Sequence, residues 1–471
     1  MMKNIVGKIV LFSVALMVAK PGIGLGQDFF RDLGTSRSSG GIGPVTPSDY
    51  TYEDASPSGL RPLRPGQDLS VPEETEETDK YNFAIGPIHF GIAAGVGIEF
   101  NDNITLSEKN RESDFIFRPV VNLDAEWRIS DLNTLRFNIG ASYAKYFDHS
   151  EFDSKGLLLS PNSELALTFF VGSLKFTVRD RFSYQEDAYD VPQLSNVAVY
   201  RRYENQAGIQ MDWAVNQAIN LAIGYDHYNL WATDDPTGVF ALQDRSIDTV
   251  FVKPSVKINP AVKLGVNASY SWINFKDSDR SDGEGLLVGP FIEWQLSEFT
   301  NFYLEGGYQD LKYNNASNFN QAAIDQLHLS AADSASVAGI LQDNQDSSNY
   351  YIKFEIDNRP SEFFRHRLSF SKTAEIGFAS NFYELYNVEY DADWKVFEHV
   401  EVGPSVFYEH YITSGPGGET GDRIGATIGL RYHFTNSLTL GLDYRYIWKN
   451  SSIEGNDYYQ NLAFLSIYYK F

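Results

Sequence analysis

The sequence predicts an all-β fold: a transmembrane, up-and-down antiparallel β-barrel of about 18 strands, with 16 as the alternative count, preceded by a disordered N-terminal extension. Three observations predict this fold. Aromatic residues make up 15% of the 471 residues. Segments of roughly 11 to 16 residues alternate apolar and polar side chains from about His89 to the end of the chain. The connections between these segments alternate between short and long.

The first residues have the pattern of a secretory signal peptide, which we place at 1–26. Lys3 and Lys8 form a basic start, residues 9–19 are apolar, and the small residues of 24–26 precede a cleavage site. A retained membrane anchor is the alternative. The apolar run is shorter than the roughly 20 residues that a helix needs to cross a bilayer, so export and removal are favoured.

Residues 27–86 differ in composition from the rest of the chain. They are rich in proline, glycine and serine, end in an acidic run, and show no apolar periodicity. We expect a flexible, acidic periplasmic extension. The acids of 73–79 could bind a basic partner, but a solvated tail is the simpler expectation. The barrel is then expected to span 87–471.

One segment near the end illustrates the alternation of the predicted strands. Between residues 438 and 448, one face carries Leu438, Leu440, Leu442, Tyr444, Tyr446 and Trp448. The other face carries Thr439, Gly441, Asp443 and Arg445. Long strands with one apolar face, one polar face and aromatic residues near their ends are typical of membrane barrels.

The choice of a barrel rests on backbone hydrogen bonding. In hydrocarbon every amide must be bonded, and a closed sheet achieves this without an open edge. A soluble β-sandwich or solenoid would show the same alternation. The long strands, the alternating loops and a final strand that reaches the last residue favour the barrel. Short turns would then face the periplasm and long loops the exterior.

The last strand carries apolar side chains at every second position and ends in an aromatic residue. This pattern resembles the C-terminal recognition signal of bacterial outer-membrane barrels, which implies the barrel-insertion machinery as a partner. The residues are Leu465, Ile467, Tyr469 and Phe471.

The first predicted hairpin carries a narrower resemblance. An Asn-Asp-Asn loop at 101–103, Asp114, and the pair Arg118 and Pro119 in the second strand resemble the opening of the β-barrel porin type 2 family. The resemblance implies an outer-membrane barrel. Some members of that family are linked to exopolysaccharide systems, which implies export or surface assembly as an alternative function.

Some residues fit the predicted strands poorly. Prolines lack a ladder donor and normally mark edges or bulges, yet four lie within predicted strands: Pro119, Pro254, Pro290 and Pro404. Asp180 falls on an apolar face, where an acid in the middle of the bilayer is costly. We expect it near the outer rim or after a register shift.

A barrel of this width leaves an aqueous channel, and its inward positions carry both signs of charge. Opposed acids and bases could set a field across the water that favours small polar or dipolar solutes. Alternatively, the charges pair with one another and solvate the wall. The candidate lumen charges are Arg118, Asp124, Glu126, Arg136, Lys175, Arg179, Glu305, Lys353, Glu355, Arg365, Arg367, Asp443 and Arg445.

The longest predicted loop, 314–348, could narrow this channel. Its segment 320–342 is rich in alanine and other helix formers. We expect a short helix there that folds inward, or else a solvent-exposed loop.

The sequence contains no catalytic motif, so we expect no enzyme, no cofactor and no metal. A lipid-active barrel enzyme would need a serine beside a histidine at the outer rim, and none stands out beside His410 or His433. The net charge of −24 disfavours nucleic acid. The expected protein is an outer-membrane porin-like channel for small hydrophilic solutes, in contact with outer-membrane lipid and lipopolysaccharide. The sequence leaves its oligomeric state open.

Overall fold

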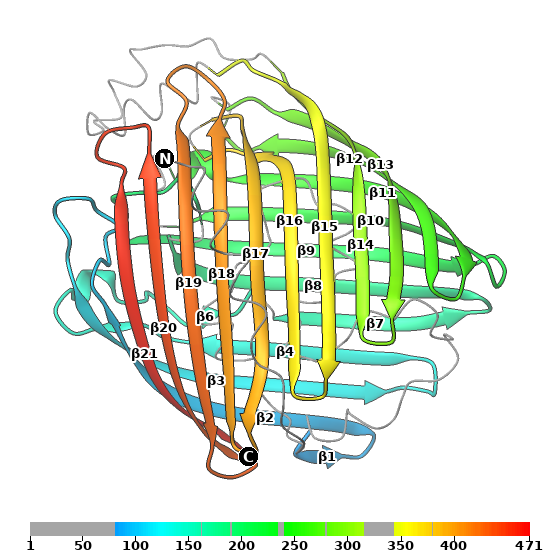
Figure 1. Cartoon of the computed structure of the whole chain (residues 1–471), viewed down its shortest axis with the longest axis horizontal. Helices are drawn as coiled ribbons and strands as arrows, with labels where there is room; N and C mark the ends of the chain where they lie inside the picture. The colour runs from blue at the N-terminus through cyan, green and yellow to red at the C-terminus, as the bar shows by residue number, and fades with distance from the viewer. Residues whose placement is uncertain are drawn as a thin grey trace.

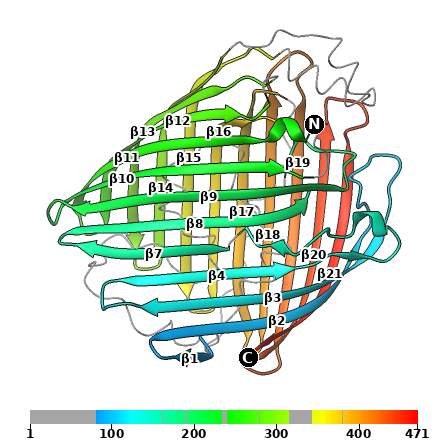
Figure 2. The same cartoon turned by 180° about the vertical axis from the view of Figure 1, so that it is seen from behind.

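The computed structural model describes residues 81–161, 163–188, 191–233, 240–277, 280–314, 343–378 and 380–471. In this part of the chain the strands run alternately up and down around a cylinder (Figures 1 and 2). Two short 3-10 segments, η3 (Ser150–Phe152) and η4 (Ala241–Gln243), lie in connections. The strands are β1 (Phe83–Ile85), β2 (Ile88–Asn101), β3 (Asp114–Arg128), β4 (Thr134–Ser142), β5 (Lys145–Tyr146), β6 (Leu158–Leu159), β7 (Glu164–Val171), β8 (Leu174–Asp187), β9 (Val199–Ala214), β10 (Ile219–Ala232), β11 (Arg245–Asn259), β12 (Val262–Phe275), β13 (Gly283–Ser297), β14 (Thr300–Tyr313), β15 (Ser347–Ser361), β16 (Phe364–Ile376), β17 (Phe382–Phe397), β18 (Val400–Thr413), β19 (Thr420–His433), β20 (Leu438–Ser451) and β21 (Tyr458–Lys470).

The sheet closes on itself. Each long strand pairs antiparallel with the next, and β2 pairs with β21 from Ala93 opposite Lys470 to Asn101 opposite Leu462. Among the described residues, β1, β5 and β6 are short additions, and the other eighteen strands form the wall. The predicted closed antiparallel barrel of 18 strands is therefore confirmed. Closure leaves no sheet edge exposed to lipid.

Short turns and long connections alternate along the wall, as predicted. The short turns form because their polar side chains satisfy local backbone amides. In the β9–β10 turn, for example, Asn216 Oδ1 accepts hydrogen bonds from the amides of Ala218 (2.8 Å) and Ile219 (2.9 Å). The long connections therefore gather at the opposite end of the barrel, which we call the long-loop end.

The outer face of the wall is apolar and exposed. Val406 in β18, Ile428 in β19 and Leu442 in β20 are 48%, 51% and 47% exposed. Along each of these strands, the residues directly before and after them point inward. A continuous exposed apolar surface of this kind is far larger than soluble proteins tolerate. Together with the closed sheet, it makes the chain an integral β-barrel of the bacterial outer membrane. The described residues include no helix long and apolar enough to cross a membrane.

The side chains of the C-terminal pattern lie on this outer face. Leu465, Ile467, Tyr469 and Phe471 are all exposed there. Recognition of these side chains by the insertion machinery remains a prediction.

The four prolines do not sit at edges or bulges, so that expectation is wrong. Pro254 pairs in register with Leu221 of β10, and the register of β11 against β12 is the same before and after it. Only the local pairing with β12 is interrupted. Pro290 shows the same one-sided interruption against β14, and Pro404 against β17. Pro119 pairs with Val96 of β2. Losing one ladder pairing on one side therefore leaves the strand in place.

Asp180 faces outward between Val178 and Phe182, in the middle of β8. It pairs in register with Leu165 of β7 and Ala207 of β9, so the expected register shift is absent. Asn205 Nδ2 donates a hydrogen bond of 2.5 Å to Asp180 Oδ1. This amide lowers the cost of an acid on an apolar face.

The first described strand, β1, begins before residue 87, where the sequence analysis places the start of the barrel. Strand β1 falls within the range 27–86 and folds back on β2, with Phe83 opposite Phe90. The predicted signal peptide, 1–26, and the range 27–80 lie outside the described residues.

A charged substitution on the outer face tests whether that face contacts lipid. Replacing Val406 by arginine should lower the free energy of unfolding by about 2–4 kcal/mol, because the side chain would enter hydrocarbon. Urea titration of the protein folded into lipid vesicles measures this change. The matched control is Ser405→Arg, which points into the lumen and should cost much less. Equal costs for the two variants would contradict a lipid-facing Val406.

Candidate channel lumen and mouth

All thirteen candidate charges lie on the inward face of the wall, and most of them face an oppositely charged neighbour. Arg118 Nε lies 2.8 Å from Glu99 Oε2 across the β2–β3 pair. Arg365 Nη2 lies 2.6 Å from Asp357, and Arg367 Nε lies 3.1 Å from Asp391.

Glu126 and Asp443 extend the same pattern. Glu126 accepts from Arg128 (2.7 Å) and Arg136 (3.0 Å), and Asp443 pairs with Arg431 (2.7 Å). Further inward ion pairs join Arg181 with Glu164, Lys263 with Glu293 and Arg423 with Glu409. The lumen wall is thus lined by ion pairs between neighbouring strands.

The other candidates have polar surroundings of their own. Asp124 accepts a hydrogen bond from Asn138 Nδ2 (3.0 Å). Glu305 is fully buried and accepts from Asn267 (2.9 Å), Tyr351 (2.8 Å) and Tyr303. Lys353 stands opposite Glu305 in the β14–β15 register, and Lys175 stands opposite Asp212 in the β8–β9 register. The remaining three of the thirteen candidate lumen charges, Arg179, Glu355 and Arg445, also lie on the inward face.

The long-loop end of the lumen is narrowed by apolar side chains from several loops, which we call the mouth cluster. Its members come from the connections β2–β3, β8–β9, β10–β11 and β16–β17 and from the adjoining wall. They are Leu106, Ala188, Val191, Leu194, Tyr200, Leu242, Phe378, Ile447 and Tyr458. Loops that are distant in sequence therefore meet inside the barrel and narrow it.

The β8–β9 connection supplies three members of this cluster because of its local turns. The amide of Val191 donates to the carbonyl of Ala188 (3.2 Å), and the amide of Leu194 donates to the carbonyl of Val191 (3.0 Å). Consecutive three-residue turns bring every third side chain to the same side. The sequence carries this signal as apolar residues at 188, 191, 194 and 197, which the period-2 analysis missed.

The same connection crosses the lumen and is tied to the far wall. Lys449 Nζ in β20 donates to Ser195 Oγ (2.9 Å) and to the carbonyl of Gln193 (3.3 Å). Gln193 Oε1 accepts from the amide of Phe378 in the β16–β17 connection (2.5 Å). The mouth is therefore held by directed bonds as well as by apolar packing.

Arg280, in the β12–β13 connection, joins three loops. Its Nη1 donates to the carbonyl of Leu242 (3.2 Å) and to Gln243 Oε1 (2.9 Å) in the β10–β11 connection. Its Nη2 donates to the carbonyls of Gly377 (2.5 Å) and Ser380 (3.0 Å). Burial, with repulsion from Arg245, lowers the pKa of Arg280 to about 9, so the side chain stays charged at neutral pH.

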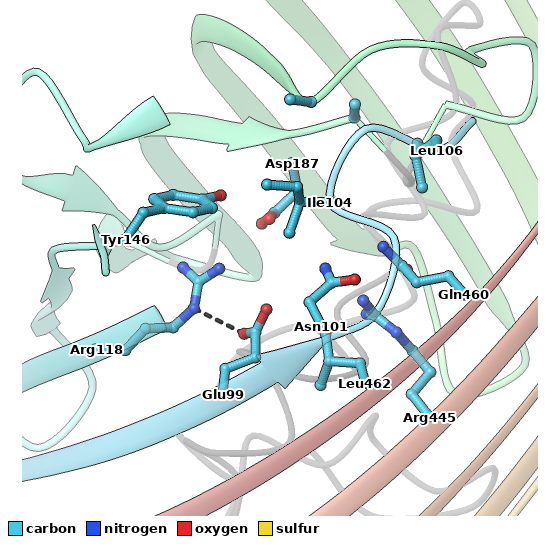
Figure 3. A pocket seen from close by; sticks show the side chains of 12 residues that line it. Glu99, Asn101, Ile104, Leu106, Arg118, Tyr146, Asp187, Arg445, Gln460 and Leu462 are labelled. Carbon is cyan, nitrogen blue, oxygen red and sulfur yellow. Dashed lines mark hydrogen bonds and ion pairs between the residues drawn. The ribbon is translucent and has the colours of Figure 1, made fainter. Parts of the chain in front are cut away.

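A cavity of about 30 Å³ lies beside the mouth, under the β2–β3 and β8–β9 connections (Figure 3). Its charged lining is balanced: Glu99 and Asp187 face Arg118 and Arg445. Gln460 points into the same space; its Nε2 donates to the carbonyl of Asn103 (3.0 Å), and its buried Oε1 has no partner. The volume suits about two water molecules.

The segment 320–342, predicted to fold inward, lies outside the described residues. Its inward fold stays a prediction. Among the described residues, the lumen is narrowed by the mouth cluster, which the sequence analysis did not identify.

The two histidines considered for catalysis lie in different environments. His410 faces outward, where Nδ1 lies 2.9 Å from Asp422 Oδ1. His433 faces inward, with Nδ1 3.0 Å from Thr439 Oγ1. Within the described ranges no serine hydrogen-bonds to either ring, so the arrangement offers no serine nucleophile activated by histidine.

Comparison with known proteins adds fold-level neighbours only. No protein-family model matches the chain, so the resemblance to the β-barrel porin type 2 family has no support from such a match. No curated protein matches its sequence. Solved structures with a related strand layout include OccAB4 of Acinetobacter baumannii, at 13% identity and a TM-score of 0.43, covering 84% of this chain and 100% of that one.

Two Pseudomonas aeruginosa structures are similar at the same level. OccK2 (OpdF), solved in complex with glucuronate, is 11% identical with a TM-score of 0.43 and covers 81% of this chain and 98% of its own. OpdK, solved with vanillate, is 8% identical with a TM-score of 0.41 and covers 81% of this chain and 99% of its own. Likeness at this level carries no argument about what this chain transports.

The crossing of the lumen by the β8–β9 connection can be tested by shortening it. Deleting residues 191–196 removes Val191, Leu194 and the two acceptors of Lys449 in this connection, so single-channel conductance in planar bilayers should rise. Deleting the exposed tip 416–418 of the β18–β19 connection is the matched control and should leave conductance unchanged. An unchanged conductance after the first deletion would show that the mouth cluster does not limit the channel.

Proposed function

We propose that the protein is a passive diffusion channel of the outer membrane for small hydrophilic solutes that are uncharged or dipolar. The observation that carries this proposal is the inner wall, where acids and bases pair across neighbouring strands while the outer face is apolar. An 18-stranded wall encloses a lumen too wide for its own side chains to fill.

The pairing of wall charges supports the solute class. A channel lined by charges of one sign selects ions of the opposite sign. Here Arg118 with Glu99, Arg367 with Asp391 and Arg431 with Asp443 compensate one another locally. Such a wall is hydrated and presents alternating partial charges, which suits sugars and zwitterions better than simple ions.

The mouth cluster supports the proposal that only small solutes pass through the channel. Buried apolar side chains from four loops occupy the long-loop end of the lumen, so large or branched solutes would be excluded there. The cluster is also the observation that favours a second function. A barrel that serves exopolysaccharide export or surface assembly as a scaffold needs no open path for small solutes.

Liposome swelling separates these two functions. Vesicles containing the protein should swell with small sugars at rates that fall steeply with sugar size and do not saturate with concentration. Vesicles with the 191–196 deletion should admit larger sugars. If vesicles containing the unaltered protein and vesicles containing the deletion variant are both impermeable to sugars, the scaffold function is favoured.

Ion selectivity tests the role of charge pairing. Asp391→Asn removes one negative charge from the lumen wall and keeps the positive charge of Arg367, so the reversal potential in a salt gradient should shift toward anion selectivity. The double variant Asp391→Asn with Arg367→Gln should restore the original value, because the unbalanced charge is gone. A control on the lipid face, Glu284→Gln, should have no effect. A single variant with unchanged selectivity would show that wall pairing does not set the lumen field.

A further inference from the structure

Two arginines at the mouth differ from the paired charges of the lumen wall. Arg245, the first residue of β11, is fully buried, and Arg280 is 3% exposed. Neither has an ion-pair partner among the residues that the structure describes, whereas Arg118, Arg365 and Arg431 each do. A buried charge without a counter-charge is strongly unfavourable.

The hydrogen bonds that these arginines make do not replace a counter-ion. Arg245 uses only Nη1, which donates to the carbonyl of Gln243 (3.0 Å), and its Nε and Nη2 are buried without an acceptor. Arg280 bonds four neutral oxygens and leaves Nε without an acceptor. The Tyr200 hydroxyl is also buried without a partner. All of these are donor groups, and each costs free energy while it lacks an acceptor.

The unused donors belong to one region. Arg245 and Arg280 both bond the segment 242–243, Arg245 through the Gln243 carbonyl and Arg280 through the Gln243 side chain. Their charges repel each other, and Arg280 also interacts electrostatically with Tyr200. Tyr200 packs against Phe378, with ring centroids 5.5 Å apart, and Phe378 directly follows Gly377, whose carbonyl Arg280 bonds.

Two described acids interact electrostatically with this region, Asp244 with Arg245 and Asp343 with Arg280, and both already accept hydrogen bonds from other donors. Asp244 Oδ1 accepts from the amide of Ala232 (2.7 Å). Asp343 Oδ2 accepts from the amide of Asn381 (2.7 Å) and from Ser414 Oγ (2.5 Å). These carboxylates moderate the local potential without occupying the free donors of Arg245 and Arg280.

We propose that Arg245 and Arg280, with the Tyr200 hydroxyl, bind a small inorganic anion of the halide class inside the mouth. Only an acceptor that carries negative charge satisfies both the unused donors and the uncompensated charge. The donor atoms are buried, which favours a monatomic ion over a larger oxyanion. The ion neutralises Arg245 and Arg280, which bond the β10–β11 and β16–β17 connections, and so stabilises the packing of the mouth cluster. This role is independent of which solute passes through the channel.

Crystallography with bromide tests the site directly. Crystals of the full protein grown in sodium bromide should show an anomalous peak in contact with the side chains of Arg245 and Arg280. Arg245→Gln should abolish the peak, and Arg181→Gln, which alters an ion-paired arginine elsewhere on the wall, should keep it. No peak at this place, bromide found only elsewhere as an adventitious ion, or a peak that survives in Arg245→Gln would overturn the proposal.

A stability measurement gives an answer that does not depend on crystals of the variant. In detergent, the thermal unfolding midpoint of the protein should rise with chloride concentration relative to gluconate at equal ionic strength, because a bound ligand stabilises the folded state. The rise should be lost in Arg280→Gln and retained in Arg181→Gln. Equal midpoints in chloride and gluconate for the unaltered protein would contradict the site.

Discussion

Closure of the sheet between β2 and β21 is the constraint on which the rest of the structure depends. In hydrocarbon, an unpaired strand edge would leave a row of backbone groups without partners, and each would cost several kcal/mol. Pairing from Ala93 opposite Lys470 to Asn101 opposite Leu462 removes that edge. Once the cylinder is closed, every strand has one face toward lipid and one toward the lumen. Alternate side chains along each strand therefore face hydrocarbon and water.

The separation of a lipid-facing side from a lumen-facing side explains where the charged side chains lie and why they form ion pairs. Charges excluded from most of the outer face gather on the inner one, where neighbouring strands hold them within ion-pair distance, as for Arg367 and Asp391. Such pairing compensates each of these charges locally. On the outer face, the carboxylate of Asp180 in the middle of β8 is compensated by the side-chain amide of Asn205. The same rule, that a charge needs a partner wherever water is scarce, makes Arg245 and Arg280 stand out at the mouth.

At the mouth, the lumen also holds loops that bond to one another and to the wall. The β8–β9 connection turns inward and meets Lys449 of β20, and Arg280 joins the carbonyls of two further connections. The wall is a rigid scaffold of paired strands, whereas the constriction is assembled from loops that depend on a few directed bonds. Under the proposed function, the wall would carry transport and the loops its restriction, a division that is common where loops on a rigid frame carry function.

The sequence by itself determined the strands, their lipid-facing side, the alternation of short and long connections, and a count near 18. These features are local, since a period of two assigns each side chain to a face without knowledge of its neighbours. Only the tertiary structure decided which charges meet and which loops enter the lumen. Lys449 and Gln193 are 256 residues apart, and their contact depends on the closed register of the whole wall. The prolines show the same limit: sequence rules predicted bulges, but continuous pairing on their other side holds the strands in register.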